Sequence, residues 1–276
     1  MTPWRLLDEE GPREGAWNMA LDEVLWQRAE EGLERRVTVR LFAWNPPCLS
    51  IGYHQEFSEA CDAAFCRRAG IDIVRRPTGG KAVLHDDEVT YSVTAPFDAP
   101  PFDGLGLVGT YDVIAGALAG ALSLLGLDVE IQERRALAPP SGAAPCFLVP
   151  SQKEILSAGR KIVGSAQRRG KRAFLQHGAV PIRLDYAALA GAAGRPPEDA
   201  EHYRAAFAGV GDLREGVTAS ALRRALQRGF AQAFGCDGAE EVPGLEEASL
   251  AEHLRAARYA GDAWTRTGKD VLARAV

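Results

Sequence analysis

Cys146 and Lys161 lie near the middle of the chain and have the chemistry of a nucleophile and its activator. A thiol with an unperturbed pKa of about 8.5 is only about 3% thiolate at neutral pH, so a cysteine nucleophile needs a nearby cation. A lysine ammonium can supply that cation, and the neutral amine can later accept a proton. Thioester exchange is nearly isoenergetic and amide formation from a thioester is downhill. Such a pair could therefore transfer an acyl group to an amine without a nucleotide.

A glycine pair follows two arginines in the segment Arg75–Asp86, where Thr78, Gly79 and Gly80 stand together. Adjacent glycines beside a hydroxyl residue let the backbone approach a ligand closely and point N–H groups at a carbonyl or phosphate oxygen. The same residues would also make an ordinary tight turn between strands, which His85 would stabilise. The segment is a candidate ligand-binding turn.

Two histidines could also take the proton of an attacking amine, although we favour Lys161 for this role. They are His85, just after the glycine pair, and His177, in the segment Gln176–Gly178. His177 could instead orient a hydrogen bond at a pocket, or be a structural histidine at the end of a strand.

The segment Arg75–Gly80 resembles the arginine-arginine-x-threonine/serine-glycine-glycine signature of the biotin/lipoate A/B protein ligase superfamily. Further matches follow in the same order along the chain, in Trp17–Asp22, Gly159–Gln167, Gln176–Gly178 and Arg258–Trp264. Such a colinear set is hard to obtain by chance. The resemblance implies an α+β fold with mixed, largely antiparallel sheets flanked by helices. It also implies that Lys161 is the active-site amine.

The superfamily contains ATP-dependent ligases and also transferases, which take an acyl thioester from acyl carrier protein and hold it on a cysteine. Upstream of Lys161 the segment Pro145–Ser151 resembles the cysteine segment of the LipM-type octanoyltransferases. The glycine-arginine-asparagine-aspartate stretch of the ligases does not occur there. In addition, Lys81 stands where ligases usually have a third glycine. Both departures favour a transferase.

The resemblance thus implies transfer of octanoyl from octanoyl-acyl carrier protein, through a thioester on Cys146, to a lysine of a lipoyl carrier domain such as the glycine cleavage H protein. We expect no cofactor and no metal. The alternatives are an ATP-dependent lipoate-protein ligase that uses Mg-ATP, an octanoyl amidotransferase acting between lipoyl domains, and a non-catalytic acyl-binding protein. The expected substrate-binding residues are Arg76, Thr78, Gly79, Gly80, His85, Gly164, Ser165, His177 and Gly178.

Composition narrows the class of protein. The chain of 276 residues has a net charge of -5, which disfavours a general nucleic-acid binder. We find no signal sequence and no apolar run of the length that a membrane span needs, which predicts a cytoplasmic protein without a membrane partner. Five cysteines without a secretion signal predict free thiols. Apart from Cys146, we expect packing or surface thiols at Cys48, Cys61, Cys66 and Cys236.

A basic run, Arg168–Arg172, lies just beyond the segment that contains Lys161. We hypothesise that it docks an acidic acyl carrier or lipoyl domain, although a solvated turn would have the same composition.

Another pattern, Gly104–Gly109, matches the glycine spacing of dinucleotide-binding loops. The residues before it are rich in proline and do not form a strand pattern, so we discount that interpretation.

Hydrophobic periodicity indicates the elements that position these residues. An amphipathic helix over Trp17–Glu31 is predicted to precede a half-buried strand over Arg36–Phe42 and a strand over Cys48–Tyr53, joined most simply as a hairpin. The glycine turn follows a predicted helix over Ser58–Ala69 and a strand over Ile71–Val74, and precedes strands over Ala82–Leu84 and Val89–Thr94.

The second half of the chain is predicted to begin with a meander and to continue as helices. Its strands cover Glu154–Leu156, Lys161–Gln167 and Arg172–Ile182, after a helix over Tyr111–Leu125. Helical periodicity begins at Tyr186 and is clearest over Thr218–Phe234. We therefore predict a catalytic body in residues 1–185 and a helical C-terminal part in residues 186–276, packed on the same domain.

Overall fold

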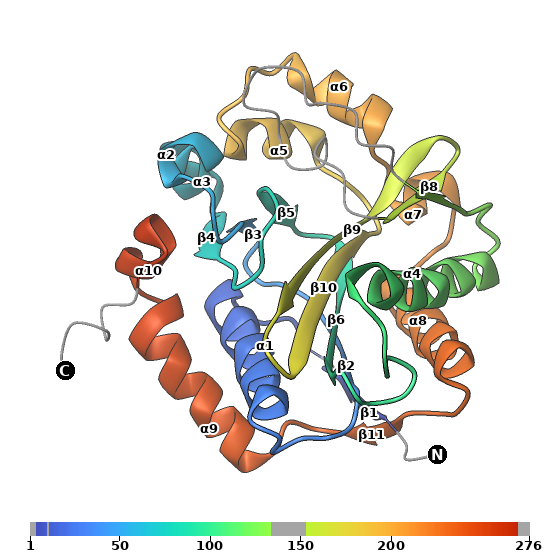
Figure 1. Cartoon of the computed structure of the whole chain (residues 1–276). Helices are drawn as coiled ribbons and strands as arrows, with labels where there is room; N and C mark the ends of the chain where they lie inside the picture. Colours follow the sequence, from blue (N-terminus) through green and yellow to red (C-terminus); the bar gives the residue numbers. More distant parts are fainter. Residues whose placement is uncertain (1–3, 10, 134–152, 270–276) are drawn as a thin grey trace.

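Two sheets carry the strands of the chain (Figure 1). The structure is a computed structural model and describes residues 4–9, 11–133 and 153–269. Among these residues the larger sheet has the order β11-β1-β2-β6-β10-β9-β8-β7 and the smaller one has the order β4-β3-β5. The strands of the larger sheet are β1 (Arg5–Asp8), β2 (Thr38–Phe42), β6 (Glu88–Pro96), β7 (Glu130–Glu133), β8 (Lys153–Ser157), β9 (Arg160–Arg169), β10 (Ala173–Pro181) and β11 (Ala239–Glu241). Those of the smaller sheet are β3 (Cys48–Ile51), β4 (Asp72–Arg75) and β5 (Val83–His85).

Most neighbouring strands of the larger sheet run antiparallel, and β1 alone pairs in parallel with both of its neighbours, β2 and β11. The predicted α+β class with mixed, largely antiparallel sheets is confirmed. The predicted meander is also confirmed, because β8, β9 and β10 follow one another in the chain and pair in that order.

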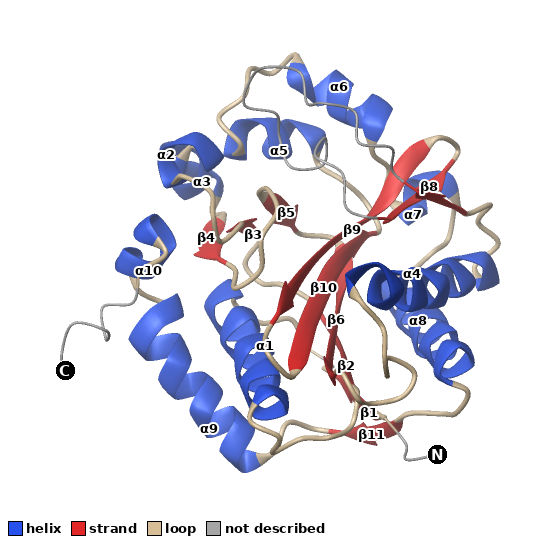
Figure 2. Cartoon of the chain, viewed as in Figure 1, coloured by secondary structure: helices blue, strands red, loops and turns tan. Residues whose placement is uncertain are grey.

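Helices cover both faces of the larger sheet (Figure 2). The helix α1 contacts β6 and β10 on one face, whereas α8 contacts β6 from the other and also packs on α4. A hydrophobic core lies on each face of the larger sheet, and in another core the buried residues of the smaller sheet pack against those of α3, α5 and α6. The helices are α1 (Gly15–Glu30), α2 (Phe57–Ala60), α3 (Ala63–Ala69), α4 (Leu107–Leu124), α5 (Tyr186–Ala192), α6 (Asp199–Ala206), α7 (Val210–Leu213), α8 (Ala219–Phe234), α9 (Leu245–Leu254), a π-helical turn (Arg255–Tyr259) and α10 (Asp262–Thr267).

The interior strand β2 is buried along its whole length. Side chains alternate across a sheet, so Leu41 enters the core under α4 and α8 while its neighbour Phe42 packs with residues of α1. The prediction of a half-buried strand was wrong, since helices cover both faces. The predicted hairpin between this strand and the next was also wrong. Both edges of β2 are already paired, with β1 and β6, and β3 belongs to the other sheet.

Two helix predictions need correction. The helix α1 was expected to be amphipathic, but it contacts both the sheet and α9, and even Asn18, Asp22 and Glu23 are buried. The single helix predicted over Ser58–Ala69 is two helices, α2 and α3. Asp62 separates them, because its carboxylate accepts the N–H groups of the first turn of α3 and so begins a new helix there.

The helix α4 has the length and composition of a membrane-spanning helix, with a mean hydropathy of 1.5 over 18 residues. The expectation that no stretch of the chain reaches that length was wrong. Buried residues such as Ile114 and Leu118 belong to the core that α4 shares with α8 and the sheet. This packing is that of a core helix, and it accounts for the apolar composition.

Candidate functional site

The candidate site lies where β9 and β10 stop pairing. Their antiparallel register ends at Gly164 and Ala179. Towards its start, β9 pairs instead with β8, and the carbonyl of Lys161 accepts the N–H of Ala208 at 3.1 Å. A cavity of about 320 Å³ lies at this point and is lined from both strands, from α4 and from the glycine turn.

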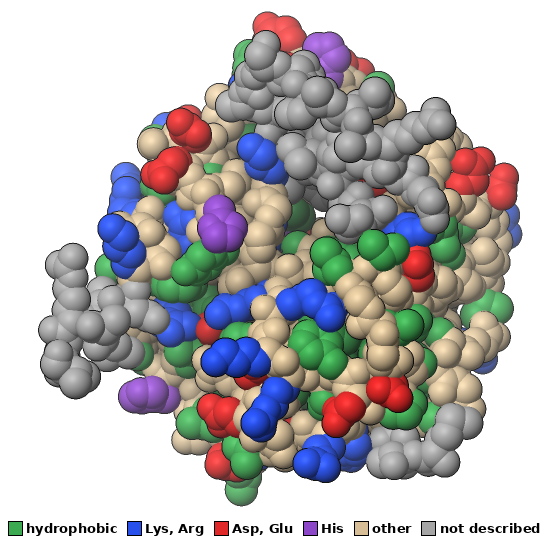
Figure 3. Space-filling model, in the orientation of Figure 1, with side chains coloured by type: hydrophobic (Ala, Val, Ile, Leu, Met, Phe, Trp, Pro, Cys, Tyr) green, Lys and Arg blue, Asp and Glu red, His purple; other side chains and the backbone are tan. Residues whose placement is uncertain are grey.

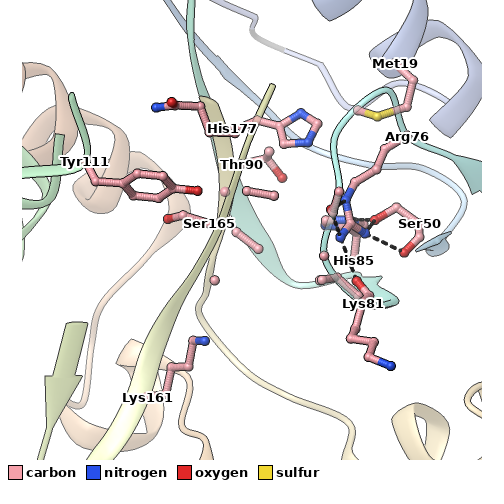
Figure 4. A pocket seen from close by; sticks show the side chains of 18 of the residues that line it. Met19, Ser50, Arg76, Lys81, His85, Thr90, Tyr111, Lys161, Ser165 and His177 are labelled. Atoms are coloured by element: carbon pink, nitrogen blue, oxygen red, sulfur yellow. Dashed lines mark hydrogen bonds between the residues drawn. The ribbon is translucent and has the colours of Figure 1, made fainter. Parts of the chain in front are cut away.

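The cavity brings together most of the residues predicted to form the site. They are Lys161, Arg76, Gly79, Gly80, His85, Gly164, Ser165, His177 and Gly178. Thr78 does not line the cavity, but its hydroxyl contacts His177 and Arg76, which do. In Figure 4, Arg76, Ser50 and His85 lie together on one side of the cavity and Tyr111 lies on the opposite side.

Two glycines of the cavity wall, Gly178 and Gly80, stand where a side chain would not fit. A Cβ on Gly178 would lie 2.4 Å from the carbonyl oxygen of Gly164 on the neighbouring strand. Gly80 has a φ of +86°, which residues with side chains rarely adopt, and a Cβ there would lie 2.8 Å from the Arg76 guanidinium. A side chain at either position would push the wall apart.

Arg76 supports the glycine turn from inside the protein. Its Nη2 donates to the carbonyls of Gly79 and Lys81, each at 2.7 Å, and its Nη1 donates to the carbonyl of Ser50 at 3.0 Å. The guanidinium is buried, and these bonds hold both ends of the turn to β3.

His177 is held between a carboxylate and a hydroxyl. Its Nδ1 lies 3.0 Å from Oδ2 of Asp22 and its Nε2 lies 2.6 Å from Oγ1 of Thr78. Asp22 also accepts from Arg40 at 2.9 Å and from Ser92 at 2.8 Å. Burial by itself would raise the pKa of Asp22, but the Arg40 guanidinium and these hydrogen bonds lower it below its ordinary value. Burial lowers the pKa of His177, so its imidazole is neutral at pH 7.

His85 is held in a similar way on the other side of Arg76. Its Nε2 lies 2.8 Å from Oγ of Ser50, and its Nδ1 lies 2.7 Å from Oε1 of Glu88. The ring stacks on the indole of Trp44, with 4.0 Å between ring centroids. Trp44 in turn donates to the hydroxyl of Thr90 at 2.7 Å. The polar side chains of this wall are therefore already hydrogen-bonded within the protein.

Lys161 forms an ion pair at the start of β9. Its Nζ lies 3.2 Å from Oε1 of Glu154, and its side chain is 7% exposed. Lys161 stands opposite Leu156 in the β8–β9 pairing, next to a shift of register between Ile155 and Leu156. The side chain of Lys161 also reaches the cavity, where Figure 4 shows it apart from the two histidines.

Cys146 lies outside the described residues, so its distance from Lys161 stays a prediction. The structure does describe the other cysteines, and none forms a disulfide. Burial raises the pKa of Cys61 to about 11 and that of Cys66 to about 12, and it also raises the pKa of Cys48. Buried thiols of this kind are poor nucleophiles, which agrees with the expected packing roles of these three residues.

Several residues of the site were not predicted. Asp22 was matched to the family segment Trp17–Asp22 without a role, and no role or position was predicted for Glu88, which precedes the strand expected over Val89–Thr94. A buried position for Asp22 could have been inferred from its helical spacing with Met19, but its partners come from distant strands. Sequence reasoning also missed several residues that line the cavity, including Ser50, Trp44, Thr90, Tyr111 and Gln167.

We expect stability to fall as the pH drops below about 6.5, because the unfolded chain takes up a proton at position 177 that the folded chain resists. The effect of one such proton is at most about 1.4 kcal/mol per pH unit. Thermal unfolding between pH 8 and pH 5 measures it. His177→Gln should flatten the slope, whereas His202→Gln, at a side chain that is 79% exposed, should leave it unchanged. Equal slopes for wild type and His177→Gln would contradict the assignment.

Comparison with known sequences identifies the family. The profile described as the lipoyl protein ligase A/B catalytic domain matches residues 14–231. This chain belongs to that family. The match includes the glycine turn, both cavity histidines and Lys161.

The similar sequences and structures agree with the family. Octanoyltransferase LipM of Kyrpidia tusciae is 40% identical over 96% of this chain and 98% of its own length. Octanoyltransferase LipM of Bacillus subtilis is 32% identical over 95% of this chain and 97% of its own length. Among solved structures, lipoate-protein ligase A bound with ATP has a TM-score of 0.81 and 27% identity, covering 96% of this chain and 99% of that chain. Protein Ta0514 of T. acidophilum, with bound lipoic acid, has a TM-score of 0.79 and 26% identity at the same coverage.

Proposed function

We propose that this chain is an octanoyltransferase of protein lipoylation. It takes octanoyl from an acyl carrier protein, holds it as a thioester on Cys146 and transfers it to a lysine of a lipoyl carrier domain. The observation that carries the proposal is the cavity, which unites the Lys161 amine with the glycine turn in a family whose curated relatives are octanoyltransferases.

The cavity suits an acyl chain that ends in a carbonyl. Its volume of about 320 Å³ is at the lower end of the range for small-ligand pockets, about 300 to 1,000 Å³. Its polar wall residues, such as Ser50, Thr90 and His85, already have protein partners, so a hydrocarbon beside them displaces no required hydrogen bond. Apolar and aromatic side chains complete the wall, including Met19, Trp44, Val83, Leu107 and Tyr111.

The glycine turn is suited to hold the carbonyl oxygen. Among the residues that the structure describes, the backbone N–H groups of Gly79 and Gly80 make no hydrogen bond. Arg76 fixes the carbonyls of the same turn, which leaves these N–H groups to a ligand. Donors held in advance in this way stabilise the negative charge that develops on a thioester oxygen during attack.

The reaction then has two steps. The Cys146 thiolate attacks the carrier thioester, and a bond forms between its sulfur and the acyl carbon. The carrier sulfur leaves with its electron pair and takes the proton of the Lys161 ammonium, so that Lys161 is neutral for the second step. The amine of the target lysine next attacks the octanoyl thioester, an amide forms, and the sulfur of Cys146 leaves as thiolate. Lys161 stabilises the thiolate in the first step and accepts the proton of the attacking amine in the second. No nucleotide enters this scheme.

Incubation with octanoyl-acyl carrier protein and a lipoyl domain, with and without Mg-ATP, tests the function. An octanoyltransferase forms octanoyl-lysine on the acceptor without ATP, as mass spectrometry of the acceptor would show. Strict dependence on Mg-ATP and free octanoate would establish the lipoate-protein ligase alternative. Transfer that requires a second octanoylated lipoyl domain, and not the carrier protein, would establish the amidotransferase alternative.

The basic turn between β9 and β10 supports an acidic protein partner. Figure 3 shows Lys and Arg side chains gathered on the face over this hairpin. Arg168 and Arg169 lie over the rings of Trp26 and Phe97, each at 4.2 Å, whereas Lys171 and Arg172 are exposed. Arg168 and Arg169 therefore also pack on the protein itself, so substitution of Lys171 and Arg172 tests docking more directly.

Reversing the charges of Lys171 and Arg172 to glutamate is expected to raise the KM for the carrier protein about tenfold at low salt. The effect should shrink at high salt, where exposed charges are screened. Steady-state kinetics at two ionic strengths measure it. The matched control reverses Arg67 and Arg68, which are exposed on α3. If both double variants raise the KM for the carrier protein equally, the change in net charge, and not a docking site at this turn, would explain the effect.

A further inference from the structure

Glu88 is a buried carboxylate just outside the cavity. Its side chain is 2% exposed and does not line the cavity wall. Oε1 lies 2.7 Å from Nδ1 of His85 and accepts a hydrogen bond from the hydroxyl of Thr90. Among the described residues no lysine or arginine forms an ion pair with it. Its contacts therefore point to His85.

The donors and acceptors available determine the direction of each hydrogen bond from Arg76 through Ser50 and His85 to Glu88. The guanidinium of Arg76 can only donate, and its Nη1 lies 3.2 Å from Oγ of Ser50. Ser50 accepts that bond, so its own hydrogen is directed at Nε2 of His85, at 2.8 Å. The hydrogen of a neutral His85 ring is then on Nδ1, where Glu88 accepts it. Glu88 thus selects the tautomer that can accept from Ser50.

The chain of hydrogen bonds continues from Ser50 to the glycine turn. Arg76 donates to Ser50 with Nη1 and to the carbonyls of Gly79 and Lys81 with Nη2. A guanidinium is planar, so fixing one end of it fixes the direction of the other. An unbroken series of hydrogen bonds therefore connects Glu88 to the turn whose N–H groups are suited to hold the acyl carbonyl.

A second series reaches Arg76 from the opposite side and serves as a comparison. Nε of Arg76 donates to Oγ1 of Thr78 at 3.2 Å, and Thr78 contacts His177, which contacts Asp22. Asp22 differs from Glu88 because it also pairs with the fully buried Arg40 at 2.9 Å. Replacing Asp22 would leave a buried cation unpaired and destabilise the fold. Glu88 can be changed without that consequence.

We propose that Glu88 is a positioning residue for acyl transfer. It acts through His85, Ser50 and Arg76 to hold the Gly79–Gly80 turn in the geometry that receives the acyl carbonyl. This inference rests on the proposed function, since it presumes that an acyl carbonyl binds at the turn. It predicts that loss of the carboxylate slows acylation of the enzyme more than it weakens binding of the donor.

The test compares Glu88→Met, Glu88→Gln and the neighbouring exposed control Asp87→Asn. Methionine cannot accept from His85, so we expect the single-turnover rate of acylation by octanoyl-acyl carrier protein to fall at least about tenfold, with the KM for the donor changed less than about threefold. Glutamine keeps an acceptor oxygen at this position and should retain most of the rate. Asp87→Asn should behave as wild type.

A second measurement reports the tautomer without any substrate. Two-bond ¹H–¹⁵N NMR spectra of the resting protein distinguish an imidazole protonated on Nδ1 from one protonated on Nε2. The chain has five histidines, and the signal of His85 is assigned by its loss in His85→Gln. We expect Nδ1 protonation in wild type and Glu88→Gln, and Nε2 protonation or a mixture in Glu88→Met.

The outcomes are distinct. If Glu88→Met keeps the wild-type rate, or keeps His85 protonated on Nδ1, the inference is overturned. If Glu88→Met does not fold, Ser50→Ala breaks the same series at a smaller residue, and a wild-type acylation rate in that variant would overturn the inference equally. If wild type itself transfers no octanoyl, the proposed function fails, whereas the tautomer measurement still decides what Glu88 does to His85.

Discussion

Replacing Cys146 by alanine is expected to abolish octanoyl transfer, with a loss of at least about 10³-fold in turnover. The proposed route passes through a thioester on this sulfur, and three of the described cysteines are poorly suited to replace it. Burial raises the pKa values of Cys48, Cys61 and Cys66 and so keeps these thiols protonated. Mass spectrometry of the wild-type enzyme after incubation with octanoyl-acyl carrier protein should show one octanoyl adduct, located on Cys146.

Cys236 provides the matched control for this experiment. It is the described cysteine that is partly exposed, so it is the one most open to unspecific acylation. Cys236→Ala should retain both the adduct and the activity. An adduct that persists in Cys146→Ala, or full activity of that variant, would remove the thioester mechanism. The ligase alternative, in which Cys146 is incidental, would then gain support.

Replacing Lys161 by methionine is expected to reduce both steps of the reaction, by about 10² to 10⁴-fold for the loss of a general base. Methionine has a similar length but carries no charge and no proton acceptor. The side chain is 7% exposed and pairs with Glu154 at 3.2 Å, so the loss leaves a partly buried carboxylate without this partner. Rapid-quench measurement of acylation and of transfer to the acceptor separates the two steps.

Lys161→Arg separates the two roles given to the lysine. Arginine keeps the positive charge but does not lose its proton near neutral pH. We therefore expect this variant to form the octanoyl adduct at a rate closer to wild type, and to transfer octanoyl to the acceptor slowly. Equal losses of both steps in the arginine variant would argue against a separate role of Lys161 as base. Glu154→Gln, which keeps the shape of the ion-pair partner, shows how far the pairing itself contributes.

Local sequence patterns predicted the elements around the site well where one periodicity dominates. The β8–β9–β10 meander placed Lys161 near the beginning of its second strand, as observed. The periodicity over Thr218–Phe234 predicted the helix α8, whose buried residues include Leu222, Leu226 and Phe230. Predictions failed where burial on two sides removes the periodicity. The helix α1 and the strand β2 are enclosed on both faces, so neither shows the polar side that an amphipathic pattern requires.

The amino-acid sequence by itself determined the family, the glycine turn and the identity of the reactive candidates, because these depend on residue types in short segments. The tertiary structure decided which distant groups meet. Asp22 on α1 reaches His177 on β10, and Glu88 on β6 reaches Ser50 on β3 only through His85. The physical reason is that these contacts depend on how elements far apart in the sequence pair and pack. The register of strand pairing decides on which face of the sheet each side chain lies, and so which side chains it meets.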